Sequence, residues 1–346
     1  GADLGARITA PPQAESSCSI YCRAPKPTAT STRHPPMSAS HPDDASAADT
    51  APPPRIALPA LRRVQLRLTT AKAPWLHREV ATRMGARLDL LKLAPTRVID
   101  WWSHTGAGKA ELTKHYPKAR HVAVEPAVVL AGLPAAASRP WWRSFARSDA
   151  MEALADDQPV AAGELLWSNM MLHWCADLRP LLSAWHPPLQ VDGMLMFSCL
   201  GPDTLAGLRR LYLRQGWGVP ASNFVDMHDL GDALVGAGFG DPVMDMEMIT
   251  LTWDSPAALL AELRGLGSNT APARATGLRT PRWQTRLEAA ITEQLAGPDG
   301  RVRLSFEIIY GHAIRAVARA PVKASTEISL QSIREMTAKR SRGTTP

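Results

Sequence analysis

Acidic and glycine residues between positions 100 and 125 have the types and spacing to bind a nucleoside. Asp100 ends a short apolar run and is followed by "SHTGAG". Gly106 and Gly108 in that turn can bring the backbone and a helix N-terminus close to a ligand. Glu125 ends the next apolar run, about 20 residues beyond the turn, a spacing at which an acid reaches ribose hydroxyls. A surface or capping acid is the alternative, but its place between an apolar strand and a proline favours the ribose interpretation.

A further acid, Asp149 in "RSDAMEAL", follows the run "WWRSFA", which we expect to be the third strand. Its carboxylate could accept a hydrogen bond from an adenine amino group. The same residue equally resembles a helix N-cap, where a short acidic side chain is favoured. Both interpretations of Asp149 stay open.

Alternating strands and helices must position these acids. The runs "TRVIDWW" and "HVAVEP" read as short strands, and the helical "KAELTKHY" between them completes a βαβ unit. The runs "GELLWSNM" and "GMLMFSCL" continue the alternation, with helical stretches between and after them. We therefore predict an α/β fold with a doubly wound, mostly parallel sheet and helices on both faces. Ligands of such sheets bind at the carboxyl ends of the strands, where Asp100 and Glu125 lie.

The segments on either side of this unit are also predicted to be regular. Before the first strand, Leu76, Val80, Met84, Leu88 and Leu91 recur at helical spacing until Pro95. After the fifth predicted strand come a helix "MHDLGDALVGAGF", a long strand "PVMDMEMITLTW", two helical stretches and a final apolar run "VRLSFEIIYGHAI".

Composition limits the architecture further. We expect a disordered tail over residues 1–55, which is rich in Pro, Ala and Ser, and a basic tail over 321–346. The domain between them, 61–320, divides into an N-terminal helical cap (61–94), a cofactor-binding half (96–200) and a C-terminal half (201–320). Apolar runs are too short for a membrane span, and no secretory signal is evident, so we expect a cytoplasmic protein.

The charged and metal-ligating residues suggest partners only weakly. The net charge of +7 suits nucleic acid, anionic lipid or an acidic protein. The densest basic cluster, Lys339 to Arg342, lies in the C-terminal tail, so we do not expect nucleic acid as a partner. Cys18 and Cys22 have no matching second pair of ligands, and Cys175 and Cys199 fall in apolar runs, so no metal is assigned.

Four segments carry a family resemblance that runs from about Trp75 to Ala320. The segment "ELLWSNMMLHWCADLRPLLSAWHPPLQVDGMLMFSCL" resembles the fourth and fifth strand region of class I S-adenosylmethionine-dependent methyltransferases. The segments "FVDMHDLGDALVGAGFGDPVMDMEMITLTW", "ELRGLGSNTAPARATGLRTPRWQTRLEAA" and "LSFEIIYGHA" resemble the malonyl-[acyl-carrier protein] O-methyltransferases of biotin synthesis. The resemblance implies a Rossmann-like sheet of seven strands.

The resemblance also implies S-adenosylmethionine as cofactor, held by Asp100, Gly106, Gly108, Glu125 and Asp149. The implied substrate is the free carboxylate of a malonyl thioester on an acyl carrier protein. Such a carboxylate is already an anion and needs no general base, so the enzyme mainly aligns the reactants in a dry pocket.

The implied substrate pocket draws on residues that follow the fourth strand. Asn169, His173 and Trp174 would line it near the transferred methyl, although Trp174 could equally pack in the core. A cation should hold the acyl carboxylate or the carrier's phosphate, and Arg143, Arg147 and Arg179 are unranked candidates.

The chain departs from the family at Trp102 and His104, which stand where the first two motif glycines would fall. Their side chains must point away from the cofactor or occupy its space. Trp75 is the candidate for the aromatic residue that covers the malonyl group in relatives. Two further hypotheses follow: a non-catalytic interaction or assembly partner that has lost the cofactor, and a methyltransferase acting on a small molecule or RNA.

Overall fold

The computed structural model describes residues 56–317, apart from residues 70–71, 134–151, 276 and 278, together with residues 7–8 and 20–21. The predicted tails, the predicted strand "WWRSFA" and Asp149 therefore lie wholly or largely outside the described residues, and the predicted domain boundaries stay predictions.

The elements of the chain are as follows. The strands are β1 (Arg7–Ile8), β2 (Ile20–Tyr21), β3 (Arg97–Trp101), β4 (Arg120–Glu125), β5 (Glu152–Ala155), β6 (Gly163–Ser168), β7 (Leu189–Leu200), β8 (Phe239–Trp253) and β9 (Val302–Arg315). The helices are α1 (Leu58–Leu68), α2 (Trp75–Leu88), α3 (Ser103–Gly106), α4 (Lys109–His115), α5 (Ala127–Gly132), the 3-10 helix η2 (Leu172–Trp174), α6 (Leu178–Trp185), α7 (Ala206–Gln215), α8 (Met227–Gly236), α9 (Pro256–Gly265) and α10 (Pro281–Leu295).

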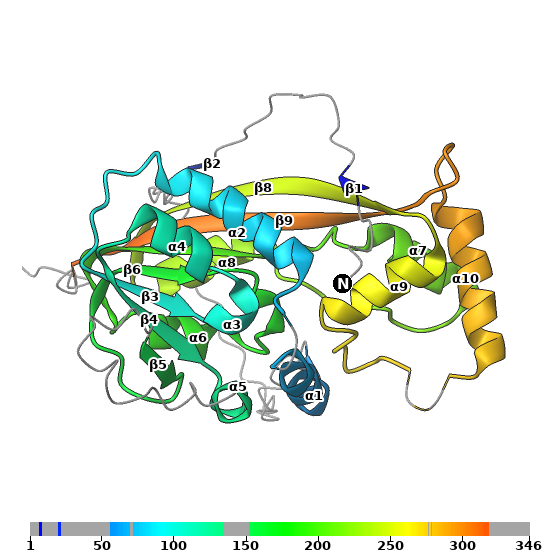
Figure 1. The fold of residues 1–346 in the computed structure, drawn as a ribbon, viewed down its shortest axis with the longest axis horizontal. Coiled ribbons are helices and arrows are strands. Elements are labelled where there is room, and N and C mark those ends of the chain that lie inside the picture. Colours follow the sequence, from blue (N-terminus) through cyan, green and yellow to red (C-terminus); the bar gives the residue numbers. More distant parts are fainter. Residues whose placement is uncertain are drawn as a thin grey trace, which may run out of the picture. The chain divides into compact units, whose positions relative to one another are not determined.

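One mixed sheet organises these elements (Figure 1). Its main strands run in the order β5-β4-β3-β6-β7-β9-β8, and the two-residue strands β1 and β2 both pair with β8. The pairs from β5 to β7 are parallel, whereas β9 is antiparallel to both β7 and β8. This arrangement confirms the predicted α/β class and the mostly parallel, Rossmann-like seven-stranded sheet. The parallel part of the sheet begins with β3 and extends through β4 to β5, and the chain then returns to β6 on the other side of β3. The switch point therefore lies between β3 and β6.

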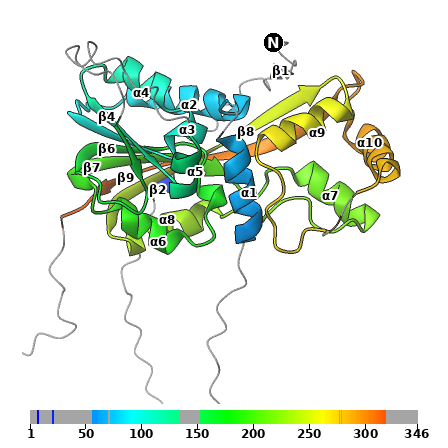
Figure 2. The same ribbon diagram turned by 60° about the horizontal axis from the view of Figure 1, so that its bottom comes forward.

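Apolar side chains on successive strand residues pack on opposite faces of the sheet. Val98 and Leu165 belong to one buried cluster, whereas their chain neighbours Ile99 and Leu166 belong to a second cluster. This separation follows from the two-residue period of a strand. In Figure 2, α2 and α4 cover the first face and α6 and α8 cover the second, as predicted for a doubly wound sheet.

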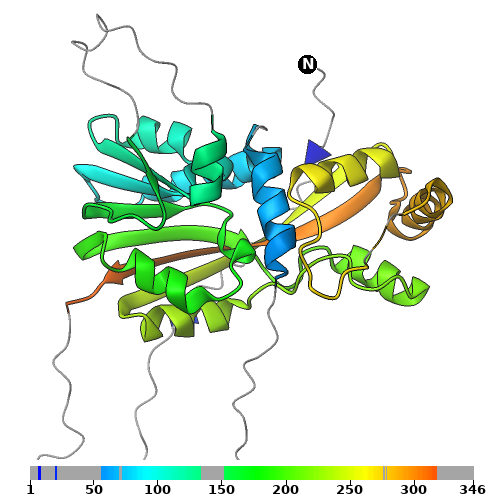
Figure 3. The same ribbon diagram turned by 90° about the horizontal axis from the view of Figure 1, so that it is seen from below.

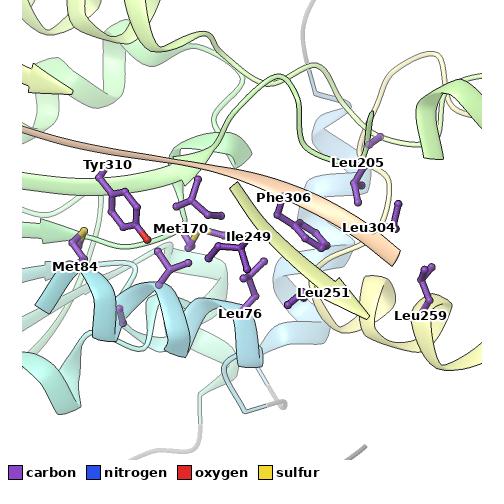
Figure 4. Close-up of a cluster of buried hydrophobic side chains, with 14 of the residues drawn as sticks. Leu76, Met84, Met170, Leu205, Ile249, Leu251, Leu259, Leu304, Phe306 and Tyr310 are labelled. Carbon is purple, nitrogen blue, oxygen red and sulfur yellow. The ribbon is translucent and has the colours of Figure 1, made fainter. Parts of the chain in front are cut away.

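The predicted helical row before the first strand is confirmed in α2. Leu76, Val80, Met84 and Leu88 are all buried and pack in the first cluster. Figure 4 shows Leu76 and Met84 facing Ile249 of β8 and Tyr310 of β9. Leu91 lies beyond the end of the helix. No helix in the described part of the chain is long and apolar enough to cross a membrane.

Candidate active site

Asp100 lies at the carboxyl end of β3, beside the switch point of the sheet. Its side chain is completely buried, and its Oδ2 accepts a hydrogen bond of 2.7 Å from the Ser103 hydroxyl. Its Oδ1 has no partner among the described residues. Burial raises the pKa of Asp100 to about 7, against the opposite effect of the Ser103 hydrogen bond. A buried acceptor is thus left for a donor that the described chain does not supply.

Glu125 occupies the corresponding place at the end of β4. Its Oε1 accepts the backbone N–H of His104 at 2.6 Å, while its buried Oε2 has no partner among the described residues. Burial raises the pKa of Glu125 to about 8, and the nearby carboxyl of Asp100 adds a smaller upward contribution. The two acids predicted from the sequence therefore lie near each other, each with one oxygen unused.

A cavity of about 1030 Å³ opens against this edge of the sheet. Ser103, His104 and Ala107 line it from the turn after β3, and Glu125 lines it from the end of β4. A ligand in the cavity would meet a carboxylate and the backbone of the turn together.

Gly108 matters for packing rather than as part of the cavity wall. A Cβ added at Gly108 would lie 2.6 Å from Nε1 of Trp167 and 2.9 Å from Oδ2 of Asp100. Gly106 is similarly close, since its Cβ would lie 3.0 Å from the carbonyl oxygen of Asn169. Neither glycine lines the cavity, so their predicted role in holding a cofactor is at most indirect: they let α4 and the turn approach the sheet.

We expect Gly108→Ala to lower the free energy of unfolding by about 2 kcal/mol, because the methyl group must displace two fully packed side chains. Chemical denaturation followed by circular dichroism measures this change. Gly231→Ala in α8 is the matched control, since its added Cβ meets nothing within 4 Å. Equal stability of the two variants would contradict the packing role of Gly108.

Trp102 takes the backbone conformation that glycine normally supplies, yet its side chain leaves the cavity free. Its φ of +60° is left-handed, which costs a non-glycine residue roughly 1–2 kcal/mol. The indole is buried in the second cluster, with its ring centroid 6.2 Å from that of Trp174, and it does not line the cavity. Of the two outcomes that the sequence left open for Trp102, the side chain pointing away is the one observed.

His104 behaves differently, because it does line the cavity. Its backbone N–H binds Glu125, and its ring Nε2 lies 3.1 Å from the carbonyl oxygen of Leu68 at the end of α1. The imidazole is thereby directed to α1 at the border of the cavity.

Asn169 is predicted to orient the substrate, but its side chain forms hydrogen bonds with other residues of the protein. Its Nδ2 donates to the carbonyls of His77 (2.8 Å) and Gly106 (2.5 Å), and its Oδ1 accepts from the Ser198 hydroxyl at 2.6 Å. The side chain is completely buried and lines neither this cavity nor the one described next. Asn169 joins α2, the glycine turn and β7, and its predicted contact with substrate has no support in this geometry.

His173 and Trp174 do line a second cavity, of about 100 Å³, beyond the ends of β6 and β7. Phe224 packs edge-on to the His173 ring at 6.0 Å, and Trp174 lies 5.2 Å from it. The Nδ1 of His173 has no partner among the described residues. Burial lowers the pKa of His173 well below its ordinary value, with a smaller contribution from His77, so the ring is neutral. It offers a polar atom in an otherwise apolar enclosure.

His77, which was not singled out from the sequence, lines neither cavity but lies behind the His173 ring. Its Nδ1 lies 2.7 Å from the Thr105 carbonyl oxygen, which identifies Nδ1–H as the donor. Burial lowers the pKa of His77 to about 4. The ring is 6.3 Å from that of His173. A signal was present: His77 shares a four-residue row with the small residues Ala81 and Gly85, and all three are buried.

Of the remaining predicted residues, only Arg179 is described by the structure. Arg179 is exposed at the start of α6 and lines neither cavity. Asp149, Arg143 and Arg147 lie outside the described residues, so their roles stay predictions. The described strand in this region, β5, begins at Glu152 and thus follows Asp149, whereas the sequence analysis placed Asp149 after the third strand.

Another cation, which the sequence did not single out, lies beside the second cavity. Arg209 donates to the carbonyls of Thr204, Ala221 and Ser222, and its guanidinium lies 5.4 Å from the Phe224 ring centroid. These contacts fix the wall of the cavity at Ala221 and Ser222.

The described residues contain no cluster of three or more His, Cys, Asp or Glu side chains that could hold a metal ion. Cys175 is half-buried and Cys199 is buried. Burial raises the pKa of the Cys175 thiol to about 12, and it also raises that of Cys199, so both thiols are protonated packing groups.

Comparison with known proteins identifies similar sequences, although no family model matches the chain. The malonyl-[acyl-carrier protein] O-methyltransferase of Laribacter hongkongensis is 41% identical over 261 residues, covering 72% of this chain and 86% of that protein. Proteins of the same description from Methylovorus sp. and Gallionella capsiferriformans are 38% and 37% identical, over 71% and 70% of this chain and 84% and 85% of their own lengths.

Solved structures with similar topology are more distant. The YcgJ protein of Bacillus subtilis aligns over 68% of this chain and 98% of its own, with a TM-score of 0.45 and 10% identity. A methyltransferase-like protein of Bacillus halodurans aligns over 68% of this chain and 99% of its own, with a TM-score of 0.44 and 14% identity.

Proposed function

Because the chain belongs to the family of malonyl-[acyl-carrier protein] O-methyltransferases, we propose that it methylates the free carboxylate of a malonyl group carried by an acyl carrier protein in biotin synthesis. The methyl donor is S-adenosylmethionine. The observation that carries the proposal is the identity of 41% over 261 residues, which covers 72% of this chain and 86% of that relative.

The residues around the larger cavity fit S-adenosylmethionine. Glu125 lines the cavity, and its buried Oε2 has no partner among the described residues; Asp100 does not line it, but its buried Oδ1 likewise has no described partner. Carboxylate acceptors suit the hydroxyl donors of a ribose and the positive charge of the ligand. Glu125 would hold the ribose, and Ser103 to Ala107 would face the ligand from the turn. When bound, S-adenosylmethionine supplies an activated methyl group.

The smaller cavity suits the acyl group. Its walls are mainly apolar and exclude water, which favours attack by a carboxylate that would otherwise be hydrated. His173 is neutral, so its ring can donate a hydrogen bond to a carboxylate oxygen without taking up a proton. A malonate anion needs no base, and the residues of the chain therefore align and desolvate it.

The alternative of a non-catalytic partner rested on Trp102 and His104 blocking the cofactor. Trp102 does not line the cavity, which weakens this ground, whereas His104 does line it, with its ring directed to α1. A cytoplasmic location is part of the proposal and is supported by the biosynthetic role of the relatives.

The test is methyl transfer from labelled S-adenosylmethionine to purified malonyl-acyl carrier protein, read by intact-protein mass spectrometry. We expect a mass gain of one methyl group on the malonyl carrier and none on an acetyl carrier, which has no free carboxylate. Cofactor binding without transfer to the malonyl carrier would contradict the substrate assignment. A folded protein that binds no cofactor would return the non-catalytic alternative.

A further inference from the structure

Helix α1 contacts the walls of both cavities. In Figures 2 and 3 it lies beside α5 on one side and beside the loop that follows α9 on the other. At its C-terminal end the Leu68 carbonyl meets the ring of His104, which lines the larger cavity. The C-terminal end of the helix thus contacts a wall of the larger cavity.

Both the N-cap of α1 and its last turn are bonded to the segment that lines the smaller cavity. The backbone N–H of Ala57 donates to the carbonyl of Thr270 at 2.8 Å. The Arg67 guanidinium donates to the Gly267 carbonyl at 2.9 Å and to the Ser268 hydroxyl at 3.1 Å. Ser268 and Thr270 line the smaller cavity. The inner side of α1 therefore packs against the residues that form the smaller cavity.

The outer side of α1 combines exposed leucines with positive charge. Leu58 and Leu66 are 63% and 46% exposed, and Arg62 lies between them in the same four-residue row. Arg63 on the adjacent row is also exposed. Residues 56–69 include no acid, and neither Arg62 nor Arg63 has an ion-pair partner within the described chain.

We propose that this outer face of α1, formed by Leu58, Arg62, Arg63 and Leu66, is the docking surface for the acyl carrier protein. The proposal rests on the proposed function, which makes a carrier protein the bearer of the substrate. An acidic carrier surface with apolar side chains would complement the arginines and cover the leucines. Docking on α1 would bring the thioester arm close to Ser268 and Thr270, which line the smaller cavity and are bonded to α1.

A second basic surface, on α10, fits this role less well. Arg279 and Arg286 lie over the rings of Trp283 and Trp217, at 4.2 and 5.8 Å from their centroids. No residue of α10 lines the smaller cavity. Positive charge alone therefore does not single out α1, whereas charge together with its contacts to the cavity does.

The experiment reverses the charges on α1. In the full chain, Arg62→Glu with Arg63→Glu is compared with Arg214→Glu with Arg282→Glu, which makes the same change in net charge at exposed sites on α7 and α10. The first readout is the dissociation constant for malonyl-acyl carrier protein, measured by calorimetry. The second is kcat/KM for that substrate divided by kcat/KM for malonyl-N-acetylcysteamine, a malonyl thioester without a protein. Thermal melting shows that both variants are folded, and Arg62→Gln with Arg63→Gln replaces the α1 variant if it is not.

We expect the α1 variant to raise the dissociation constant and lower the kcat/KM ratio about 30-fold, with the control within about 3-fold of the unmodified chain. Equal losses in both variants would overturn the proposal, because they would show attraction by overall charge. Unchanged carrier binding in the α1 variant would overturn it as well. Carrier binding that depends on α1 without methyl transfer would support the docking surface and contradict the proposed function.

Discussion

Replacing Glu125 with glutamine will weaken S-adenosylmethionine binding about 100-fold. A carboxylate can accept charge-assisted hydrogen bonds from two ribose hydroxyls, and losing the charge costs about 1.4 kcal/mol for each. The glutamine oxygen can still accept the His104 N–H, so the turn keeps its support. Isothermal titration of the two proteins at pH 8.5 measures the change.

The same variant will also lose a pH dependence. In the free protein the pKa of Glu125 is raised to about 8, so at pH 7 the carboxyl is largely protonated and cofactor affinity is reduced. Affinity should rise as pH increases from about 6 to about 8.5, with proton release on binding, and the rise should be smaller in Glu125→Gln, where only the carboxyl of Asp100, with a pKa of about 7, still titrates beside the ligand. The stability of the free protein changes in the opposite direction. Between the ordinary pKa of a glutamate and about 8, Glu125 binds a proton in the folded state but not in the unfolded state, so the free energy of unfolding falls as pH rises.

Glu111→Gln provides the control for Glu125→Gln, because Glu111 lines the same cavity from α4 instead of from the end of β4, with its Oε1 bonded by the Thr82 hydroxyl and its Oε2 3.8 Å from the Lys114 ammonium. We expect its cofactor affinity to stay within about 3-fold of the unmodified protein. Similar losses in both variants would show that cavity charge, rather than the acid at the end of β4, controls affinity.

Replacing Trp102 with glycine, which restores the family residue, will destabilise the protein by about 3 kcal/mol. The change removes a left-handed strain of roughly 1–2 kcal/mol but empties a buried indole site, whose loss typically costs 3–5 kcal/mol and leaves a cavity. Glycine also increases the entropy of the unfolded chain. Urea denaturation followed by circular dichroism gives the difference.

His104→Gly is the paired experiment for Trp102→Gly, since both variants restore motif glycines. His104 lines the cavity and makes one ring contact with Leu68, so its loss should cost less than about 1 kcal/mol. A Trp102→Gly protein as stable as the unmodified chain, or one that binds cofactor more tightly, would show that the indole obstructs the site after all.

The features that could be predicted from the sequence are those that depend on residues close together in the chain. The row from Leu76 to Leu88 and the acids at the ends of β3 and β4 follow from periodicity and strand ends, and both are found as expected. Glu125 was correctly predicted to end its strand, and the structure places it at the cavity. These features depend on the residues within one or two elements.

Features that depend on distant segments could not be predicted. Asn169 forms hydrogen bonds with His77, 92 positions away in the sequence, with Gly106, 63 positions away, and with Ser198, 29 positions away. The side chain of Trp102 packs in a site that Trp174 and other residues of the second cluster form, so its position depends on distant parts of the sequence. No local pattern states that β9 inserts between β7 and β8, because that order is decided by pairing among three strands.

The position of β9 also governs how the chain can be made. Strands β7 and β8 are synthesised well before residues 302–315, yet each forms its longest pairing with β9. A nascent chain therefore carries two long unpaired strand edges until its last strand leaves the ribosome, and such edges template association with other chains. During synthesis from the N-terminus, the parallel strands can pair before β9 is available to join β7 to β8. The yield of this protein in cells should depend on chaperones that shield β7 and β8 during that interval.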